Sequence, residues 1–518
     1  MTSGSSITPA IDCHAQAQTY AGQPHPDKKK IFVFCDGTGN KFADNRKAED
    51  ANSNVVKLYT TLRVAGNQVA YYHPGVGTMG DPNIRHAIPR FWSKVKGLAF
   101  GAGFKANVLD AYRYLMEVYN DGDDIYLFGF SRGAYTARAL AGMLHGFGLL
   151  CRGNEGHLLY AWNMFHDGVS DKRTLLKMSP NKRGGQSAHT IESNFAFAET
   201  YSRRVTIRFM GIWDTVSSVG WIYEPVRLLS MAQNPIIQVG RHAVSIDERR
   251  AYYRDNLWGP PLKITDSQWP DELRLRGIQQ DIVQVWFPGV HSDVGGSYPQ
   301  WEAAPANDAL RWMIGELQRN GAELCQERID MVLGKPTGAY SMDEIYTPPP
   351  TSHHCIHDSL KRMWWLLQLL PQQYYDKDDQ RIQWRVPYGV PRHIPNGAII
   401  HSSAVQRIEN TVQGERPYEP RNLKRGQYRP LLAPPPDTTA DLTGCYIYQN
   451  ADSAKSDSTG LRIAKLIAGW ISFCFLLLVL IIVAWYLVGV IGSLLLLAIA
   501  LVAHTPGLRD LFSWVLHM

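Results

Sequence analysis

The chain has 518 residues, with 53 basic and 47 acidic side chains, a formal net charge of +6, 45% hydrophobic residues and 19% charged residues. This length and composition indicate a globular protein with a full-sized core and exclude a chain that is disordered throughout. The positive charge is small and dispersed, and no recognition motif accompanies it, so we expect no nucleic-acid partner. Seven scattered cysteines without CxxC pairs indicate reduced thiols in a cytoplasm rather than a disulfide framework.

The first part of the chain predicts an α/β protein. Residues 1–29 are polar, lack the apolar stretch of a secretory signal, and are expected to form a disordered tail. Short apolar runs typical of buried parallel strands follow at 31–35, 69–72, 124–128, 205–212, 282–287 and 398–400. Amphipathic helices are predicted after an N-cap at Ser53 or Asn54, over Lys105–Val118 and over Ala134–Leu144. Strands that alternate with helices imply a doubly wound, mostly parallel sheet.

Three long intervals without strong periodicity separate the later strands, at 150–204, 215–280 and 325–395. We interpret them as cap or lid insertions over one edge of the sheet, because the loops at the carboxyl ends of parallel strands carry function. The very apolar stretch Trp364–Leu370 is interpreted either as core or as a lid that meets lipid.

The C-terminal segment predicts a membrane anchor. No Asp, Glu, Lys or Arg occurs from Leu466 to Leu508, and the apolar run Leu466–Ala503 would reach about 57 Å as a helix at roughly 1.5 Å per residue. The core of a bilayer is only about 30 Å thick, so two spans fit better than one. We therefore predict a transmembrane helical hairpin at 463–504, a linker at 446–462, a short tail at 505–518, and a single α/β domain with insertions at 30–445.

A five-residue pattern marks a candidate nucleophile. Gly129-Phe-Ser131-Arg-Gly133 lies between a predicted strand and a predicted helix, as Gly-x-Ser-x-Gly does in a nucleophile elbow. Glycine is needed on both sides because the serine lies in a tight, strained turn, where a neighbouring Cβ would clash. The turn lifts the hydroxyl clear of the sheet, so Ser131 is the predicted nucleophile and 30–445 the predicted catalytic domain.

A serine nucleophile needs a base, usually a histidine oriented by a carboxylate, and in this kind of site both follow the serine along the chain. Asp214 follows the strand predicted at 205–212, and His291 follows the strand predicted at 282–287 in a loop rich in glycine. The predicted triad is therefore Ser131, Asp214 and His291. Two alternatives stay open: Asp293 as the acid with His401 as the base, or Asp214 paired with His401.

The oxyanion that develops during ester cleavage needs two N–H donors. We predict the amide of Arg132 as one donor and the first strand-end loop, at Gly37 and Thr38, as the source of the other. The carboxylate of Asp36 is expected to brace this turn. His353, His354, Cys355 and His357 do not have the spacing of a metal site, so neither a metal nor a cofactor is expected.

These motifs together resemble a known family. Phe34-Cys-Asp-Gly-Thr38, Gly129-Phe-Ser-Arg-Gly-Ala134, Trp213-Asp-Thr-Val216 and Gly289-Val-His-Ser-Asp-Val-Gly-Gly296 are similar to the α/β-hydrolase domain shared by type VI secretion phospholipase effectors and many uncharacterised bacterial proteins. Ser245-Ile-Asp-Glu-Arg-Arg250 and Ile400-His-Ser-Ser403 also look like signatures of that family. The resemblance covers roughly residues 30–405. It implies hydrolysis of glycerophospholipid acyl esters and supports Ser131, Asp214 and His291, while His401 lies in a family motif and stays an alternative base.

We therefore expect a serine carboxylester hydrolase that acts on membrane phospholipid through a triad and an acyl-enzyme. The alternatives are a membrane-inserting toxin or scaffold with a hydrolase fold, and an esterase that acts on a non-lipid ester. Lys455, Arg462, Lys465 and Arg509 flank the predicted spans, which indicates a bacterial inner-membrane protein with its catalytic domain in the cytoplasm. The resemblance instead indicates a secreted effector that acts on a target-cell membrane, with a secretion apparatus or an immunity protein as a partner.

Overall fold

We obtained a computed structural model of the chain, which divides into two compact units. The first comprises Met1–Leu360 with Val390–Ser453, and the second comprises Lys361–Gly389 with Ala454–Met518. The structure describes residues 28–37, 51–75, 97–167, 196–216, 220–221, 224–225, 233–251, 253–261, 280–334, 356–361, 363–369, 372–376, 381–410, 417–436 and 438–449, together with Ile471, Cys474, Trp485, Tyr486 and Gly489.

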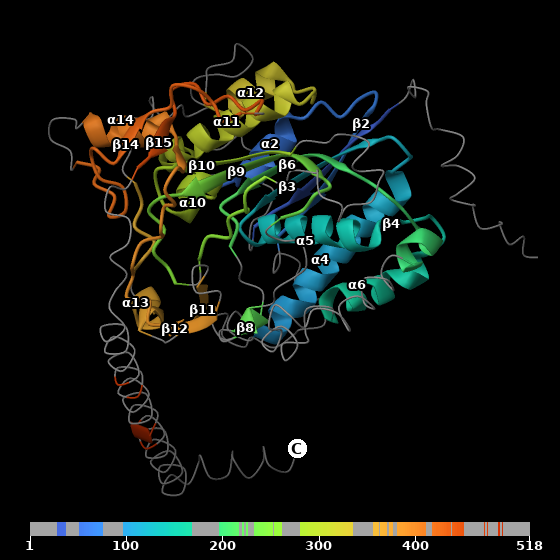
Figure 1. Cartoon of the computed structure of the whole chain (residues 1–518), viewed down its shortest axis with the longest axis horizontal. Helices are drawn as coiled ribbons and strands as arrows, with labels where there is room; N and C mark the ends of the chain where they lie inside the picture. Colours follow the sequence, from blue (N-terminus) through green and yellow to red (C-terminus); the bar gives the residue numbers. More distant parts are fainter. Residues whose placement is uncertain are drawn as a thin grey trace, which may run out of the picture. The chain divides into compact units, whose positions relative to one another are not determined.

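Nine described strands form the sheet of the first unit (Figure 1). Seven neighbouring strands run parallel to one another, and two more strands extend one edge of the sheet through antiparallel pairings. This agrees with the mostly parallel α/β sheet predicted from the sequence. The interval 215–280, which the sequence indicates as an insertion, contains the central strand β9. The order across the sheet is β2 (Gln68–His73), β1 (Lys30–Cys35), β3 (Asp124–Phe130), β6 (Ile207–Trp213), β9 (Ile237–Ser245), β10 (Asp281–Phe287), β13 (Ile399–Ile400), β15 (Tyr446–Tyr448) and β14 (Tyr428–Pro430).

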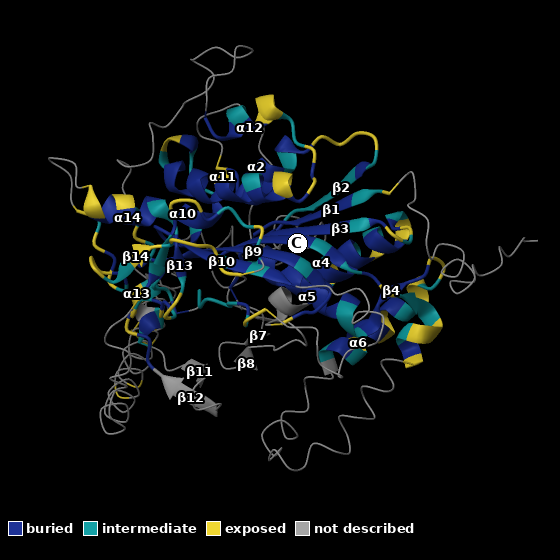
Figure 2. Cartoon of the chain, turned by 45° about the horizontal axis from the view of Figure 1, so that its top comes forward, coloured by how far each residue is buried: buried dark blue, intermediate teal, exposed yellow. Residues whose placement is uncertain are grey.

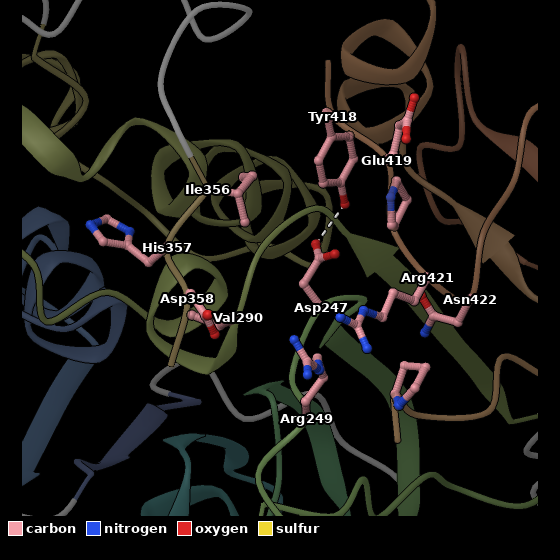
Figure 3. A pocket seen from close by; sticks show the side chains of 12 residues that line it. Asp247, Arg249, Val290, Ile356, His357, Asp358, Tyr418, Glu419, Arg421 and Asn422 are labelled. Atoms are coloured by element: carbon pink, nitrogen blue, oxygen red, sulfur yellow. Dashed lines mark hydrogen bonds between the residues drawn. The ribbon is translucent and has the colours of Figure 1, made fainter. Parts of the chain in front are cut away.

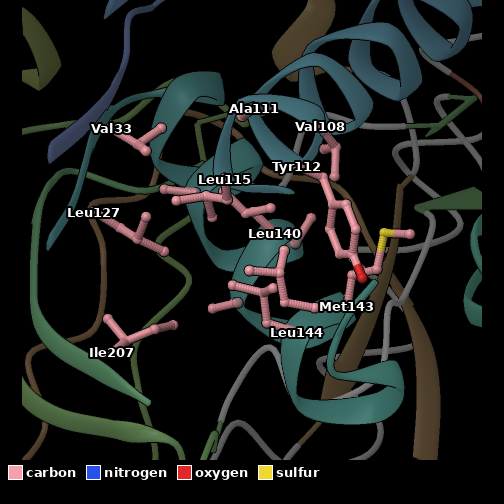
Figure 4. Packing of buried hydrophobic residues seen from close by; sticks show 14 of the residues in the cluster. Val33, Val108, Ala111, Tyr112, Leu115, Leu127, Leu140, Met143, Leu144 and Ile207 are labelled. Atoms are coloured by element: carbon pink, nitrogen blue, oxygen red, sulfur yellow. The ribbon is translucent and has the colours of Figure 1, made fainter. Parts of the chain in front are cut away.

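Helices cover both faces of this sheet (Figure 1). Ile31 and Val33 of β1 belong to one hydrophobic core and Phe32 and Phe34 to another, as the two-residue period of a strand requires. Figure 4 shows how side chains of the helices meet strand residues such as Leu127 in the first core. The first core is closed by α4 (Gly97–Val118), α5 (Arg132–Phe147) and α6 (Leu158–Asp167), and the second by α2 (Asn54–Thr61), α11 (Ala304–Arg319) and α12 (Gln326–Val332).

Short elements follow the carboxyl ends of the strands. Because β3, β6, β9, β10 and β13 are parallel neighbours, the loops after them meet at one edge of the sheet. Figure 2 shows that the central strands leading to this edge are buried. The other elements that the structure describes in the first unit are α10 (His291–Gly295), α14 (Ser402–Glu409), the 3₁₀ turns η1 (Glu155–His157) and η3 (Gln300–Glu302), and two short antiparallel pairs, β4 (Leu149–Leu150) with β5 (Ser202–Arg203) and β7 (Gly220–Trp221) with β8 (Glu224–Pro225).

In the second unit, the structure describes one helix and one antiparallel hairpin of strands. The helix is α13 (Met363–Gln368), and the strands are β11 (Gln372–Asp376) and β12 (Arg381–Arg385). Most of the apolar stretch Trp364–Leu370 therefore lies in a helix, on which Trp365 is 46% exposed.

Two expectations from the sequence are corrected. A membrane-spanning helix needs about 20 consecutive apolar residues, and no helix among the described residues combines such length with such apolarity. The prediction of a transmembrane hairpin at 463–504, most of which lies outside the described residues, is wrong by this criterion, and the inner-membrane localisation loses its basis. The expectation of reduced thiols holds for Cys35, Cys325, Cys445 and Cys474 but not for Cys151, which is disulfide-bonded.

Candidate active site

The predicted nucleophile lies in a strained turn between β3 and α5. Ser131 has φ 59° and ψ −122°, a conformation that costs a residue other than glycine about 1–3 kcal/mol. At Gly129 a Cβ would lie 2.5 Å from the carbonyl oxygen of Gly133, and at Gly133 a Cβ would overlap the carbonyl oxygens of Cys35 and Asp36. Neither glycine therefore has room for a side chain, for the steric reason that the sequence pattern indicates.

Asp214 and His291 form a buried hydrogen-bonded pair. Asp214 follows β6, and His291 is the first residue of α10, just after β10. Nδ1 of His291 lies 2.5 Å from Oδ2 of Asp214, and the two residues are 4% and 1% exposed. Nε2 of His291 forms no hydrogen bond with any residue that the structure describes. The imidazole is thus anchored through one nitrogen, which leaves the other for proton exchange.

The ring of His291 lies beside the serine turn. Phe130, which precedes Ser131, packs against this ring with the two centroids 4.6 Å apart. Helix α10 approaches equally closely, because a Cβ at Gly295 would overlap the Phe130 ring. The backbone amide of Ser131 also donates to the carbonyl of Trp213 at 3.1 Å, which ties the turn to the end of β6. No hydrogen bond joins the Ser131 hydroxyl to His291 among the described contacts; such bonds tighten when substrate binds.

An arginine that the sequence did not indicate holds the carboxylate of Asp214. Arg392, 178 residues further along the chain, donates to Oδ1 at 2.5 Å and to Oδ2 at 3.0 Å. The backbone amide of Ser245 donates to Oδ1 at 2.9 Å. Burial by itself would raise the pKa of Asp214, but the charge of Arg392 and the hydrogen bond from His291 outweigh it and hold the pKa well below its usual range. The carboxylate is therefore ionised at neutral pH and orients the imidazole.

The segment Ser245–Arg250, which begins at the last residue of β9, supports the loop that carries His291. Asp247 Oδ2 accepts a hydrogen bond from the amide of Gly289 at 2.7 Å, and Glu248 Oε2 accepts one from the amide of His291 at 3.2 Å. The sequence indicates this segment as a motif without suggesting a role for it. Its side chains fix the backbone of the histidine loop.

The alternative acid and base have other partners. His401 is the N-cap of α14, where Nδ1 accepts from the amide of Ser403 at 3.3 Å and lies 2.8 Å from its hydroxyl. Burial and the charge of Arg311 lower the pKa of His401 to about 4. Asp293 Oδ1 lies 2.6 Å from Nδ1 of His357. Within the described contacts, neither of the alternative pairs with His401 is formed.

The predicted oxyanion donors differ in their surroundings. Arg132 is the first residue of α5, so its amide lies at the positive end of the helix dipole. The amide of Gly37 donates to Oδ1 of Asp36 at 2.6 Å. The carboxylate of Asp36 also accepts hydrogen bonds from the hydroxyl of Ser53, the N-cap of α2, at 2.7 Å and from the hydroxyl of Tyr72 in β2 at 2.8 Å. Asp36 therefore braces this turn. Thr38 lies outside the described residues.

Of the residues His353, His354, Cys355 and His357, the structure describes His357. His357 uses both ring nitrogens, because Nε2 lies 3.1 Å from Oε2 of Glu302 while Nδ1 contacts Asp293. His353, His354 and Cys355 lie outside the described residues. In the part of the chain that the structure describes, no group of three His, Cys, Asp or Glu side chains is arranged to hold a metal ion.

The comparisons with known proteins identify the class to which this fold and site belong. Residues 29–316 match the family model of type VI secretion system (T6SS) effectors described as "Phospholipase effector Tle1-like, catalytic domain". The match covers more than half of the 518 residues and contains Ser131, Asp214 and His291. The chain therefore belongs to the Tle1-like family of phospholipase effectors, which supports a lipid ester hydrolase in general terms.

Two further proteins are similar over shorter parts of their length. The "Uncharacterized protein YEL023C" of Saccharomyces cerevisiae is 32% identical over 244 residues, which are 46% of this chain and 34% of that protein. The chain thus spans about a third of the length of the yeast relative. A crystal structure of an uncharacterized protein from Pseudomonas aeruginosa is 19% identical, with a TM-score of 0.32 over 62% of this chain and 49% of that one. A TM-score at that level establishes no common fold.

Proposed function

We propose that this protein is a serine carboxylester hydrolase that cleaves acyl esters of membrane glycerophospholipids. The observation that carries the proposal is the buried Asp214–His291 pair, whose imidazole packs against Phe130 beside the strained turn of Ser131. Family membership supports the phospholipid substrate. A non-lipid ester is the alternative substrate, and product analysis separates the two.

In the proposed mechanism, Oγ of Ser131 attacks the acyl carbonyl carbon while Nε2 of His291 takes the hydroxyl proton. Burial lowers the pKa of His291 despite its hydrogen bond to Asp214, so the imidazole is neutral and able to accept a proton at pH 7. Asp214, kept ionised by Arg392, stabilises the imidazolium that forms. The amide of Arg132 faces the developing oxyanion, as the residue after the nucleophile does in this kind of elbow.

Collapse of the tetrahedral intermediate breaks the ester bond. His291 gives its proton to the departing alkoxide of the lysophospholipid, and the acyl group stays on Ser131. Water then attacks the acyl-enzyme, with His291 again taking a proton, and the fatty acid leaves as Ser131 recovers its hydroxyl proton. A second N–H donor at Gly37 would have to exchange its bond to Asp36 for one to the oxyanion. No step in this sequence calls for a cofactor.

Membership in the effector family also bears on partners and location. Proteins of a type VI secretion effector family are expected to be delivered by that apparatus, to act on target-cell membranes, and to be paired with an immunity protein. We extend these properties to this protein as part of the proposal, with residues 30–445 as the catalytic domain.

The test combines fluorophosphonate labelling of the full chain with mass spectrometry of lipid products. Wild type should label and should release fatty acid and lysophospholipid from phospholipid vesicles. Ser131→Ala should abolish labelling and reduce turnover by about 10⁴-fold or more, because the members of a triad act as a unit. Ser292→Ala, which removes a neighbouring hydroxyl outside the proposed mechanism, serves as the matched control. Retention of a tenth of wild-type turnover by Ser131→Ala would remove this serine from the mechanism.

A further inference from the structure

The ring of His291 has a second aromatic neighbour besides Phe130. The centroid of the Tyr253 ring lies 4.8 Å from that of the imidazole, and the two planes meet at 73°. Phe130 lies at a similar distance, 4.6 Å, but its plane is tilted by only 31°. The imidazole therefore packs against one ring that is nearly parallel and one that is nearly perpendicular. Two neighbours in such different orientations restrict the rotation of a ring whose Nδ1 is already bound to Asp214.

The ring of Tyr253 is in turn held by a cation. The guanidinium carbon of Arg250 lies 3.5 Å from the centroid of this ring, a cation–π contact between two partly buried side chains. The amide of Tyr253 donates to the carbonyl of Arg250 at 2.9 Å, and this turn brings the two side chains together. Glu248 fixes the guanidinium by accepting from its Nε at 3.0 Å and from Nη2 at 2.8 Å. Arg250 thus holds the phenol ring in one orientation.

The segment Ser245–Arg250 supplies this support because its side chains alternate between two places. Glu248 and Arg250 belong to the candidate active site. Asp247 and Arg249, one residue before each of them, instead line a pocket of about 190 Å³. Figure 3 shows this pocket and the hydrogen bond by which Tyr418 holds Asp247. The segment is therefore anchored on the pocket side while Arg250 extends over the ring beside the imidazole.

The backbone of Tyr253 is tied to the acid of the proposed triad. Arg392 donates from Nε to the carbonyl oxygen of Tyr253 at 3.1 Å, and the same guanidinium holds the carboxylate of Asp214. The contacts close on themselves, because Arg392 leads from Tyr253 back to the carboxylate that binds His291. A displaced phenol ring would therefore leave the imidazole free to turn away from Ser131.

We propose that Tyr253 is a positioning residue for His291, and that Arg250 acts through it by fixing the phenol ring. This inference rests on the proposed function, in which the imidazole must present Nε2 to the hydroxyl of Ser131. Tyr253 exchanges no proton in that mechanism. It keeps the base aligned with the nucleophile, so its loss acts on the catalytic step rather than on substrate binding.

Arg250 also acts on the charge of the imidazole. Burial is the largest influence and lowers the pKa of His291, while the hydrogen bond and charge of Asp214, itself paired with Arg392, oppose this. The positive charge of Arg250 lowers the pKa of His291 further, and the negative charge of Glu248 raises it. Removal of the Arg250 charge leaves Glu248 without its cation, so both consequences raise the pKa of the imidazole. A change in packing alone would not produce this shift.

The role of the ring is tested on the full chain by steady-state kinetics with phospholipid in mixed micelles. Tyr253→Leu should lower kcat by about 10–100-fold and leave KM within about threefold, because a misaligned base slows the chemical step. Tyr253→Phe keeps the ring and should stay within about threefold of wild type in both constants. A loss in Tyr253→Phe as large as that in Tyr253→Leu, or a loss carried by KM, would overturn the proposal.

Tyr119→Leu is the matched control for these variants. The guanidinium of Arg203 lies 5.0 Å from the centroid of the Tyr119 ring, so this tyrosine is also covered by an arginine. Tyr119 precedes β3 and therefore lies toward the amino ends of the strands, away from the candidate active site. Its kcat should match that of wild type. Equal values of kcat for Tyr253→Leu and Tyr119→Leu would overturn the proposal.

The role of Arg250 is tested through the pH dependence of kcat/KM, whose acid limb reports the base of the free enzyme. The acid limb should move to higher pH in Arg250→Met and stay in place in Arg203→Met. An unmoved limb in Arg250→Met would overturn the role of Arg250. NMR of the full chain with ¹³C at Cε1 of histidine, assigned through His291→Gln, follows the same titration without substrate. Absence of ester turnover by wild type would refute the proposed hydrolase function, whereas a His291 resonance that neither Tyr253→Leu nor Arg250→Met alters would overturn the contacts inferred here.

Discussion

Two aspartate–histidine pairs lie close together in this protein, and they differ in a way that bears on function. Nδ1 of His291 lies 2.5 Å from Asp214, and Nδ1 of His357 lies 2.6 Å from Asp293. The distances are nearly equal, so distance alone does not distinguish a catalytic pair from a structural one. The surroundings of the second ring nitrogen, Nε2, distinguish the two pairs.

His357 is held by carboxylates on both sides, since Nε2 contacts Glu302 and the ring stacks on Tyr298 with centroids 3.8 Å apart. Burial lowers the pKa of His357, but the hydrogen bonds and charges of Asp293 and Glu302 outweigh it, so the pKa is raised. In His291, Nε2 has no partner in the described part of the chain, and burial lowers the pKa. The His357 ring is suited to stay protonated between its two carboxylates, and the His291 ring is suited to cycle between neutral and charged forms.

The largest expected effect separates the two rings by mutation. His291→Ala should lower kcat/KM on phospholipid by about 10⁴-fold or more, because it removes the proposed base. His357→Ala should cost less than about tenfold, since it removes a bridge between loops and no reacting group. Steady-state kinetics on both variants, with circular dichroism to confirm folding, provide the measurement.

His401→Ala serves as a third member of this set. It removes the N-cap of α14, which is worth about 1 kcal/mol of stability, and should leave kcat/KM within about tenfold of wild type. A larger loss in His401→Ala or His357→Ala than in His291→Ala would transfer the role of base to that residue.

The next largest effect is expected from removing the arginine that holds the Asp214–His291 pair in place. Arg392→Gln removes the bidentate partner of Asp214 and leaves a buried carboxylate without its countercharge. Breaking a buried ion pair costs about 3–5 kcal/mol of stability, and we expect kcat to fall by about 10–100-fold as the imidazole loses its orientation. Arg113→Gln is the matched control, because Arg113 and its partner Asp110 are 45% and 44% exposed, and such pairs contribute about 0–1 kcal/mol. Chemical denaturation measures the stability of both variants, and single-turnover kinetics measure their catalytic step. If Arg392→Gln behaved like the control variant, the contact of Arg392 with Asp214 would be dispensable.

The smallest expected effect is on pH dependence. Because the folded pKa of His357 is raised, its contribution to stability is fully present below the unfolded pKa of about 6.5 and is lost as pH rises through the folded value. The free energy of unfolding of wild type should therefore exceed that of His357→Gln more at pH 5.5 than at pH 8.5, by less than about 1 kcal/mol.

The activity of wild type should respond to acid in the opposite way. It should persist until pH falls below about 6.5, because only neutral His291 accepts a proton and its pKa is lowered. A wild-type acid limb well above pH 6.5, or a stability difference that grows toward pH 8.5, would reverse the roles of the two rings.

Features with a local signal could be predicted from the sequence. The apolar runs that form β1, β3 and β10 are short and uninterrupted, and the two glycines around Ser131 are required by sterics within five residues. Asp214 and His291 could be nominated because each follows such a run directly. The roles of these three residues in catalysis stay predictions, although the structure brings two of them into contact.

Features that depend on distant partners could not be predicted in this way. Strand β9 carries Arg241 and His242 in its centre, which hides it from any apolar pattern. Arg241 is buried there because it pairs with Glu316 at 2.5 Å and with Asp281 at 2.7 Å, both of which come from later parts of the chain. A buried charge is tolerable only with such partners, and they are assembled only when the sheet forms.

The choice among candidate acids and bases was also made by the tertiary structure. The sequence determined that Asp214, Asp293, His291 and His401 lie at strand ends, since this follows from local apolar patterns. It did not determine which of them meet, because Asp214 and His291 are 77 residues apart and Arg392 is 178 residues from Asp214. Strand order and register set these contacts, and they come from packing across the whole sheet rather than from any short segment.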